Sequence, residues 1–155
     1  MLFRRLPIAD AVFRLDRLPA GLLAHPRDRV TLGWQDRMTP RARLRTEAGV
    51  EFGTALAPGV VLREGDCLTL EQPPLVVMVH EREEPVLVAR AASAAQAARW
   101  AYYIGNSHQP LMVAADALVC ADLPGMAQVL THHAIPFTRE QRTFTPESQG
   151  PEHHR

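Results

Sequence analysis

The sequence contains no lysine, and arginine alone supplies seventeen positive charges against seventeen acidic residues. Without lysine, the chain can form neither a Schiff base nor the lysine contact of a phosphate-binding P-loop. The arginines are spread from Arg4 to Arg155 instead of gathering in one segment, which argues against a nucleic-acid-binding groove. The charge pattern therefore excludes lysine chemistry and predicts no nucleic-acid partner.

Long hydrophobic runs are also missing. No stretch approaches the roughly 18 apolar residues that a transmembrane helix needs. The opening segment, MLFRRLPIAD, carries arginines with no apolar run behind them, unlike a secretory signal. We therefore predict a cytoplasmic protein with no membrane partner. A composition that is 46% hydrophobic and 22% charged indicates a globular chain of one ordinary domain or two small ones.

Common enzyme signatures are absent as well. None of GxGxxG, GxxxxGK[ST], HExxH or GxSxG occurs, so we predict that the chain is not an enzyme. The two cysteines, Cys67 and Cys120, fit no disulfide framework and no CxxC metal site. The absence of such motifs favours Cys67 and Cys120 as small buried hydrophobic residues. A nucleophile formed by one of them with His108 is the alternative.

The first half of the chain is rich in turns and short strand-like segments. Residues 29–34, 38–45, 50–55, 60–62 and 67–70 have the length and the β-branched or alternating pattern of strands, and turn-forming residues separate them. The adjacent Pro73 and Pro74 then interrupt the pattern, because paired prolines do not sit inside a central strand. These features predict an all-β N-terminal domain over residues 1–73.

The second half mixes strands with helices. A continuous apolar strand over 75–79 is expected to pair in a hairpin with a strand over 85–89. Ser93 followed by Gln96 is a capping-box pattern, and the helix it begins is expected to end at Gly105 or Asn106, which tolerate positive φ. Strands over 110–113, 117–119 and 134–137 and a helix from Asp122 to Leu130 complete the pattern.

This order of elements is typical of an α+β fold. Strand, strand, helix, strand, strand, helix and strand predict a ferredoxin-like α+β sandwich over residues 74–143. Residues 144–155 are polar and contain prolines, and they are expected to form a flexible C-terminal tail.

Histidine is the remaining candidate for chemistry. The chain has seven: His25, His80, His108, His132, His133, His153 and His154. His132 and His133 are adjacent and point in different directions, so they make a poor chelating pair. The pair in the tail, His153 and His154, is either accidental or a mobile ligand arm.

His108 stands apart because it follows the end of the predicted helix, on a connection where side chains project outward. The helix before it carries Trp100, Tyr102 and Tyr103, more aromatic surface than one buried stripe needs, which suggests a partner surface. If two copies met there about a two-fold axis, their His108 imidazoles would face each other. One histidine per chain would then supply half of a metal site.

The residues around His108 resemble a family signature. YYIGNSHQPL, residues 102–111, is similar to the Y-x-L-G-N-R-H-x-P-L signature of the UreE family of urease accessory proteins, which are nickel metallochaperones. Three further segments resemble the family in the same order. They are DR with RARLRTEAG (36–37, 41–49), LAPG with LREGD (56–59, 62–66) and FTPE (144–147).

The resemblance implies an N-terminal β domain related to chaperone peptide-binding modules and a C-terminal ferredoxin-like domain that dimerises. It also implies that His108 binds Ni²⁺ at the interface of a homodimer, with His153 and His154 of the tail as further ligands. The metal would pass to the accessory GTPase UreG and on to the urease apoprotein. Imidazole also suits Zn²⁺ and Cu²⁺, so the ligand type alone does not select nickel.

The chain departs from the family pattern at three places. Ser107 replaces the usual arginine beside the histidine, and CADLP at 120–124 lacks the peripheral histidine pair of some members. The chain ends in EHHR instead of a long polyhistidine tail, so high-capacity nickel storage is not expected. A peptide-binding adaptor, whose β domain does the main work and whose metal binding is incidental, is the alternative function.

Overall fold

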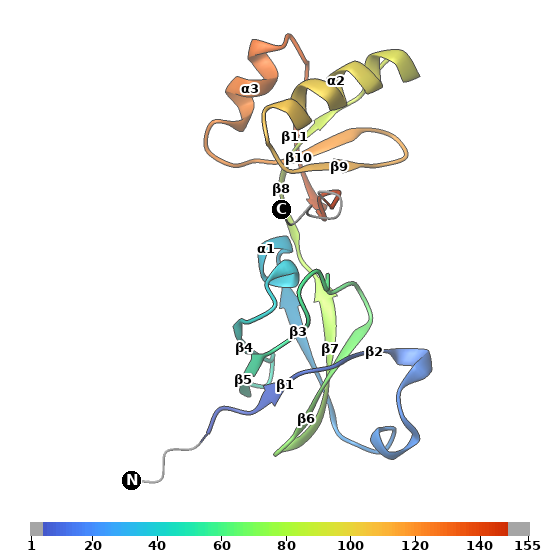
Figure 1. Cartoon of the computed structure of the whole chain (residues 1–155), viewed down its shortest axis with the longest axis vertical. Coiled ribbons are helices and arrows are strands. Elements are labelled where there is room, and N and C mark those ends of the chain that lie inside the picture. Colours follow the sequence, from blue (N-terminus) through green and yellow to red (C-terminus); the bar gives the residue numbers. More distant parts are fainter. Residues whose placement is uncertain (1–4, 149–155) are drawn as a thin grey trace, which may run out of the picture. The chain divides into compact units, whose positions relative to one another are not determined.

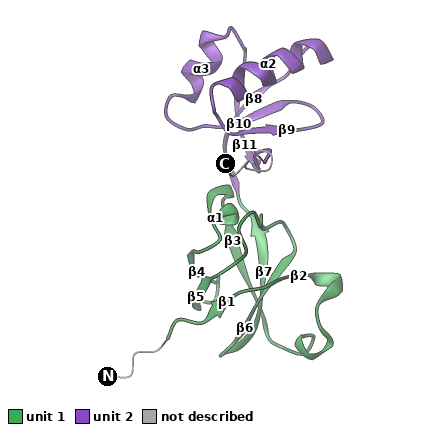
Figure 2. Ribbon diagram, viewed as in Figure 1, with its two compact units in different colours: residues 1–82 green, residues 83–155 purple. Residues whose placement is uncertain are grey.

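The structure is a computed structural model, and it describes residues 5–148. The chain divides into two compact units, Met1–Arg82 and Glu83–Arg155 (Figure 2). The predicted boundary after residue 73 is therefore wrong, because β7 (Pro74–Glu81) belongs to the first unit. Since the apolar segment 75–79 pairs with strands of unit 1, it cannot form the expected hairpin with 85–89.

Unit 1 is built from two sheets, and long connections join β2 to β3 and β5 to β6 (Figure 1). One sheet has the order β1-β5-β4 and the other β2-β6-β7-β3. The strands are β1 (Ile8–Ala9), β2 (Val12–Arg14), β3 (Arg27–Leu32), β4 (Arg43–Arg45), β5 (Glu51–Thr54) and β6 (Asp66–Glu71), besides β7. A short helix, α1 (Trp34–Met38), occupies a position that the sequence predicted as turn and strand, and residues 60–62 form no strand.

The two prolines lie in a hairpin and not at a domain edge. Glu71 pairs with Pro74, so Gln72 and Pro73 form the turn between β6 and β7, and the Gln72–Pro73 peptide bond is cis. Pro74 stands at the first position of β7, where the lost N–H is tolerated. The prolines therefore mark a turn inside unit 1.

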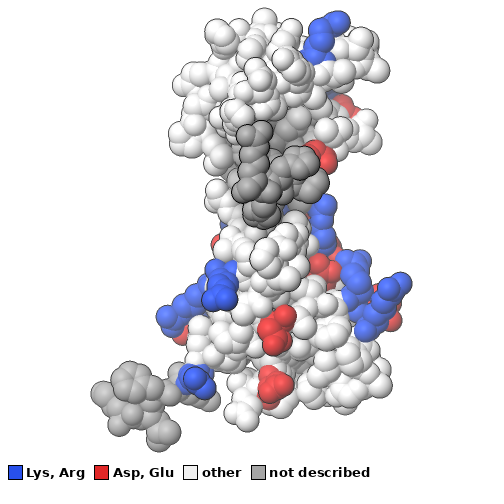
Figure 3. All heavy atoms as spheres, viewed as in Figure 1, with Lys and Arg blue, Asp and Glu red and all other residues white. Residues whose placement is uncertain are grey.

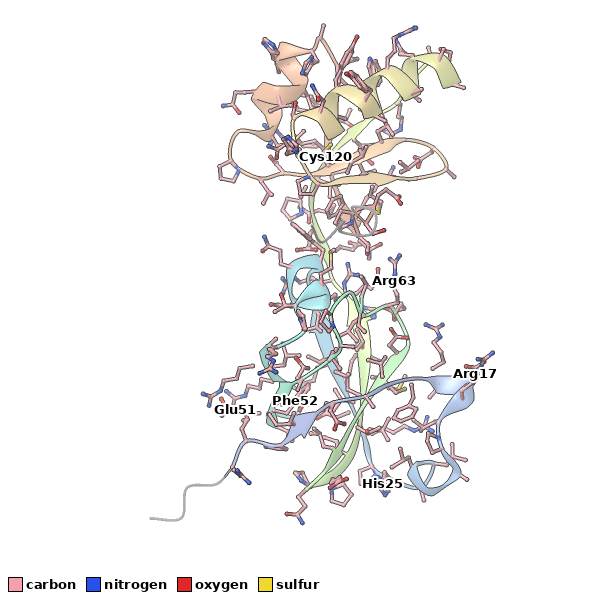
Figure 4. The ribbon with its side chains drawn as sticks, viewed as in Figure 1. Arg17, His25, Glu51, Phe52, Arg63 and Cys120 are labelled. Atoms are coloured by element: carbon pink, nitrogen blue, oxygen red, sulfur yellow. The ribbon has the colours of Figure 1, made fainter. Side chains whose placement is uncertain are left out.

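The core of unit 1 follows from alternation along its strands. In β5, Glu51 points to solvent and pairs with Arg43 at 3.1 Å, whereas Phe52 is fully buried (Figure 4). The same cluster collects apolar residues from both sheets: Ala9, Val30, Leu32, Leu44, Leu56, Leu62, Leu68, Leu70, Leu75, Val77 and Val79. The strands β6 and β7 bury apolar residues on both faces, since their alternate residues Cys67 and Val76 form a second cluster with Leu18.

Two of the sequence motifs in unit 1 have structural roles. Arg37 of the DR motif is buried, donates to the carbonyl oxygen of Leu62 at 3.2 Å and lies 3.5 Å from the carboxylate of Glu81. Asp66 of the LREGD motif accepts hydrogen bonds from Arg63 N and Arg14 Nη1, both at 2.8 Å. A buried charge is stable only when it is paired. These contacts therefore fix the segments that contain Leu62 and Arg63 against α1 and β6.

Unit 2 confirms the predicted α+β fold. Its elements are β8 (Glu83–Ala89), α2 (Ala94–Asn106), β9 (Leu111–Val113), β10 (Leu118–Ala121), α3 (Met126–His132) and β11 (Thr138–Thr143). They form an antiparallel sheet of order β11-β8-β10-β9, which is the ferredoxin-like βαββαβ arrangement. The last strand begins at Thr138, after the segment 134–137 where the sequence predicted it.

The helices of unit 2 cover one face of this sheet. Leu87, Leu118 and Cys120 pack there with residues of both helices, namely Trp100, Ile104, Met126 and Leu130. Trp100 is therefore mostly core and not the exposed aromatic surface that the sequence suggested. No helix within residues 5–148 is both long and apolar enough to cross a membrane.

Candidate functional site

The helix that precedes His108 begins as its sequence predicts. Ser93 has extended backbone angles, and its hydroxyl accepts a hydrogen bond from Gln96 N at 3.1 Å. The side chain of Gln96 reaches back and accepts from Ala92 N at 2.8 Å. The bond to Ser93 satisfies an amide that the helix start leaves unpaired, so the predicted N-cap is confirmed, while the return bond from Gln96 goes to the residue before the N-cap.

The end of this helix differs from the prediction and places His108 in an unusual conformation. The helix continues through Asn106, and the residue with positive φ is His108 itself, at 56°. His108 N donates to Gly105 O at 3.0 Å, and Gln109 N donates to Ile104 O at 3.4 Å. This is the Schellman pattern of bonds, in which the left-handed position is usually glycine.

The imidazole of His108 is accessible. The residue is exposed, and within residues 5–148 its ring makes no hydrogen bond, ion pair or ring contact. Its backbone amide is bound instead, to Gly105 O, and the preceding residue is fixed because Ser107 Oγ donates to Tyr103 O at 2.9 Å. The structure therefore presents an unengaged imidazole on a hydrogen-bonded helix end.

The other histidines of unit 2 are engaged differently. His133 stacks on the ring of Tyr103, with centroids 4.9 Å apart and planes 6° apart. The ring of His132 lies 5.0 Å from that of His133 at 78°, so the two rings are not parallel. Within the described part of the chain, no group of three or more histidine, cysteine or acidic side chains is placed to hold a metal. His153 and His154 lie outside the described residues.

The two histidines of unit 1, His80 and His25, have surroundings within that unit. His80 Nδ1 lies 2.8 Å from the Glu64 carboxylate. The pKa of Glu64 is lowered by its hydrogen bonds to Glu81 N and to His80, which together outweigh the effect of burial. His25 is half-buried in unit 1 (Figure 4). Neither histidine belongs to the same compact unit as His108.

Both cysteines are buried and free, as the sequence favoured. Burial raises the pKa of the Cys120 thiol to about 12 and also raises the pKa of Cys67. Cys120 belongs to the cluster between the sheet and the helices of unit 2 (Figure 4). A thiol with a raised pKa is almost entirely protonated at neutral pH, so neither cysteine is suited to be a nucleophile.

The segment after β11 is packed, although the sequence predicted a flexible tail from residue 144. Phe144 is fully buried and Thr145 is nearly so. Thr145 N donates to Met112 Sδ at 3.3 Å, and Glu147 N donates to Leu111 O at 2.7 Å. The start of the predicted tail therefore binds β9, whose first residue follows His108 closely in the chain. A phenylalanine in an otherwise polar segment is the sequence signal for this packing.

Comparison with known proteins assigns both units of the chain to one family. The model of the UreE urease accessory protein, N-terminal domain, matches residues 14–80, and that of the C-terminal domain matches residues 84–155. The chain belongs to the UreE family. The two matches divide close to Arg82, as the two units do.

Curated relatives support the UreE assignment. Urease accessory proteins UreE of Burkholderia mallei (strain SAVP1) and Burkholderia pseudomallei (strain K96243) are each 34% identical over 132 residues, which is 85% of this chain. A third, from Burkholderia thailandensis, is 34% identical over 119 residues, or 77% of this chain. The matches cover 64%, 63% and 55% of the three relatives, so the chain spans less than two thirds of their length.

Within this UreE-family chain, the motif segments divide by what their side chains do. Arg37, Asp66 and Phe144 are buried and maintain the two units. His108 is exposed and takes no part in the packing. The arrangement distinguishes His108 as a candidate ligand from motif residues that serve the fold.

Proposed function

We propose that this chain is a cytoplasmic nickel metallochaperone for urease maturation, and not an enzyme. His108 from each of two subunits would bind Ni²⁺ at a homodimer interface. The observation that carries the proposal is an exposed histidine, without a side-chain partner among the described residues, in a backbone conformation that favours glycine.

The backbone of His108 supports a functional reading over a capping one. A non-glycine residue in the left-handed region costs about 1–2 kcal/mol. Glycine would end the helix with the same hydrogen bonds and without that cost. A residue that lowers stability where a better one exists is expected at a functional position.

The surface beside His108 fits a second copy of the chain. Arg99 is the only arginine on α2 and α3, which carry no acidic residue, and Tyr102 is 68% exposed. In the view of Figure 3, unit 2 displays few charged side chains, whereas unit 1 displays many. Interface cores are poor in charge and rich in tyrosine. Association about a two-fold axis would place like residues opposite each other, and would pair the two His108 rings.

Two imidazoles alone hold a metal weakly, so the proposal includes further ligands. His153 and His154 would raise the donor number to three or four. Imidazole affinity follows Ni²⁺ < Cu²⁺ > Zn²⁺, so delivery to urease through UreG, and not affinity, would confer nickel specificity. Because only neutral imidazole coordinates, metal binding should weaken below about pH 6.

A titration of purified full-length protein tests the proposal. His108→Ala should lower Ni²⁺ binding well below one ion per dimer by calorimetry, while His80→Gln, altered in unit 1, should bind as the wild type does. Light scattering should find dimers in both. Truncation before His153 should weaken binding and leave the dimer intact. Retention of the tight site in His108→Ala would refute the central assignment.

A groove in unit 1 favours peptide binding as the second candidate function. The groove measures about 1330 Å³, and its lining includes Arg5, Ile8, Arg43, Arg45, Val50 and Glu71. Ile8 is 51% exposed, so an apolar surface lies among charged residues. If a client protein bound the His108→Ala variant without nickel, and Ile8→Ser abolished that binding, the adaptor function would be favoured over the metallochaperone.

A further inference from the structure

Two adjacent histidines, His132 and His133, lie at the end of α3. His132 is the last helical residue and His133 is the C-cap. A helical turn takes about 3.6 residues, so successive side chains of a helix point about 100° apart. The sequence therefore predicted that the two side chains diverge. In the structure, however, the centroids of their rings lie 5.0 Å apart, with the planes at 78°. The two imidazoles are thus close neighbours.

A tyrosine of the other helix supports this pair. Helices α2 and α3 pack on the same face of the sheet (Figure 1), and the ring of His133 stacks on that of Tyr103, with the planes 6° apart. Tyr103 itself packs against the core between the helices and the sheet. A side chain that is already held by packing loses less freedom when it binds a ligand. The stack therefore prepares His133 for binding.

The spacing of the two rings matches that of two imidazoles on one metal ion. A zinc–nitrogen bond is about 2.0–2.1 Å long, so the centre of a coordinated imidazole lies about 3.2 Å from the metal. Two imidazoles on a tetrahedral ion then have centres about 5 Å apart. His132 and His133 have this spacing. His132 is exposed, and the torsion that turns its ring has broad minima, so its ring can turn to aim a nitrogen at an ion held by His133.

The surroundings of the pair set the strength of such a site. The last turn of a helix carries partial negative charge, which favours a bound cation beside His132 and His133. Within residues 5–148, no third histidine, cysteine or acidic side chain completes a metal-binding group there. Water would therefore occupy the remaining coordination positions. Because two imidazoles hold an ion more weakly than three or four, this site should fill after the interface site of the proposed function.

We propose that His132 and His133 form a second metal site in each chain, for a divalent transition-metal ion that prefers imidazole, such as Zn²⁺, Ni²⁺ or Cu²⁺. Tyr103 is its positioning residue, since it touches His133 and not the metal. Tyr103 precedes His108 by five residues, about 8 Å along the axis of α2, so the site lies against the helix that carries the candidate ligand at its end. The site belongs to one chain and needs neither His108 nor a second subunit. It therefore goes beyond the proposed function and is independent of it.

The alternative role of the pair is packing alone. His133 joins α3 to α2 through its stack on Tyr103, and His132 would then be only an exposed neighbour. Phenylalanine at position 133 separates the two roles, because it keeps an aromatic ring against Tyr103 and removes the nitrogen donors. Glutamine at position 132 keeps a polar side chain at the surface and removes the other imidazole.

Nuclear magnetic resonance of the histidine rings reports the site directly. Zn²⁺ is added to the full-length protein, and the ring nitrogen signals of each histidine are followed. One ion bound by both rings should shift the signals of His132 and His133 over the same range of Zn²⁺ concentration. The same titration of His108→Ala should give the same result, so failure of this site and failure of the interface site can be told apart.

Each single variant should weaken the response of the histidine that remains. His133→Phe should raise the Zn²⁺ concentration that shifts His132 at least about tenfold, because a chelate loses its effective-concentration advantage with one arm. His132→Gln should do the same for His133. Tyr103→Leu should weaken binding about two- to tenfold by freeing the ring of His133, whereas Tyr103→Phe keeps the stack and should bind as the wild type does. His80→Gln, altered in unit 1, is the control and should have no effect.

Fluorescence of Trp100 during urea unfolding checks the fold of each variant, because Trp100 lies in the core of unit 2. If His133→Phe unfolds more easily than the wild type, His132→Gln, changed at an exposed position, decides the question. Three results would each overturn the proposal and leave the pair with a packing role. They are no shift of either ring, shifts of the two rings over separate Zn²⁺ ranges, and a remaining histidine whose response is unchanged in the single variants.

Discussion

Replacing Gly105 with alanine tests which residue ends α2 in the left-handed conformation. The sequence favoured Gly105 or Asn106, but the positive φ lies at His108. Gly105 has no atom within 4 Å of the position that a Cβ would take. Alanine is favoured over glycine in a helix by about 0.8–1 kcal/mol. Gly105→Ala in the last turn should therefore stabilise unit 2 by about 0.5–1 kcal/mol.

His108→Gly should stabilise the same unit by a different route. Relief of the left-handed conformation contributes about 1–2 kcal/mol. The greater freedom of glycine in the unfolded chain takes back about 0.4–1 kcal/mol. A net gain of about 0.5–1 kcal/mol corresponds to a melting temperature about 2–8 °C higher for a unit of this size. Ni²⁺ binding should be lost in the same variant, so stability and function would change in opposite directions.

Gly125→Ala is the matched control. Gly125 also has open space for a Cβ, but its φ is 88°, so alanine there should destabilise by about 1 kcal/mol. Fluorescence of Trp100, which lies in the core of unit 2, can follow urea unfolding of all three variants. If Gly105→Ala destabilises as Gly125→Ala does, then Gly105 carries the positive φ, and the argument about His108 is refuted.

Two further predictions concern the face of the unit 2 sheet that lies opposite the helices. Phe144→Ala should destabilise unit 2 by about 3–5 kcal/mol, the usual cost of emptying a buried phenylalanine site, whereas a free tail would show no change in urea unfolding. Hydrogen bonds from Arg90 and Thr138 lower the pKa of Glu140 to about 2, so its stabilising effect is complete above about pH 4.5 and is lost as the pH falls toward 2. Glu140→Gln should therefore show a shallower loss of stability over that range, and equal slopes would contradict the ion-pair assignment.

Local sequence signals predicted the elements whose partners are close in the chain. Ser93 and Gln96 cap α2 because both ends of the interaction lie within one helical turn. The strands of unit 2 fell near their predicted positions for a similar reason, since alternation is a property of consecutive residues. Only the final strand was placed too early, because the apolar residues Ile135 and Phe137 pack with the helices before β11 begins.

Pairing of distant strands could not be predicted in the same way. The apolar segment 75–79 is compatible with either neighbour, and a single sequence does not say which strand will lie beside it. In the structure, β7 lies between β6 and β3, and it is parallel to β3. The pairing of β7 with β3 joins residues that are far apart in the chain. The boundary between the two units therefore depends on the folded structure and not on the local sequence.

The sequence by itself determined the α+β class, the capped helix, the buried cysteines and the choice of His108 as the candidate ligand, because each depends on residue type and short spacing. The tertiary structure alone decided that β7 belongs to unit 1, that His108 holds the left-handed position and that Phe144–Glu147 crosses the sheet. These features depend on which distant backbone groups satisfy one another's hydrogen bonds, and a buried backbone must satisfy them wherever the chain brings a partner.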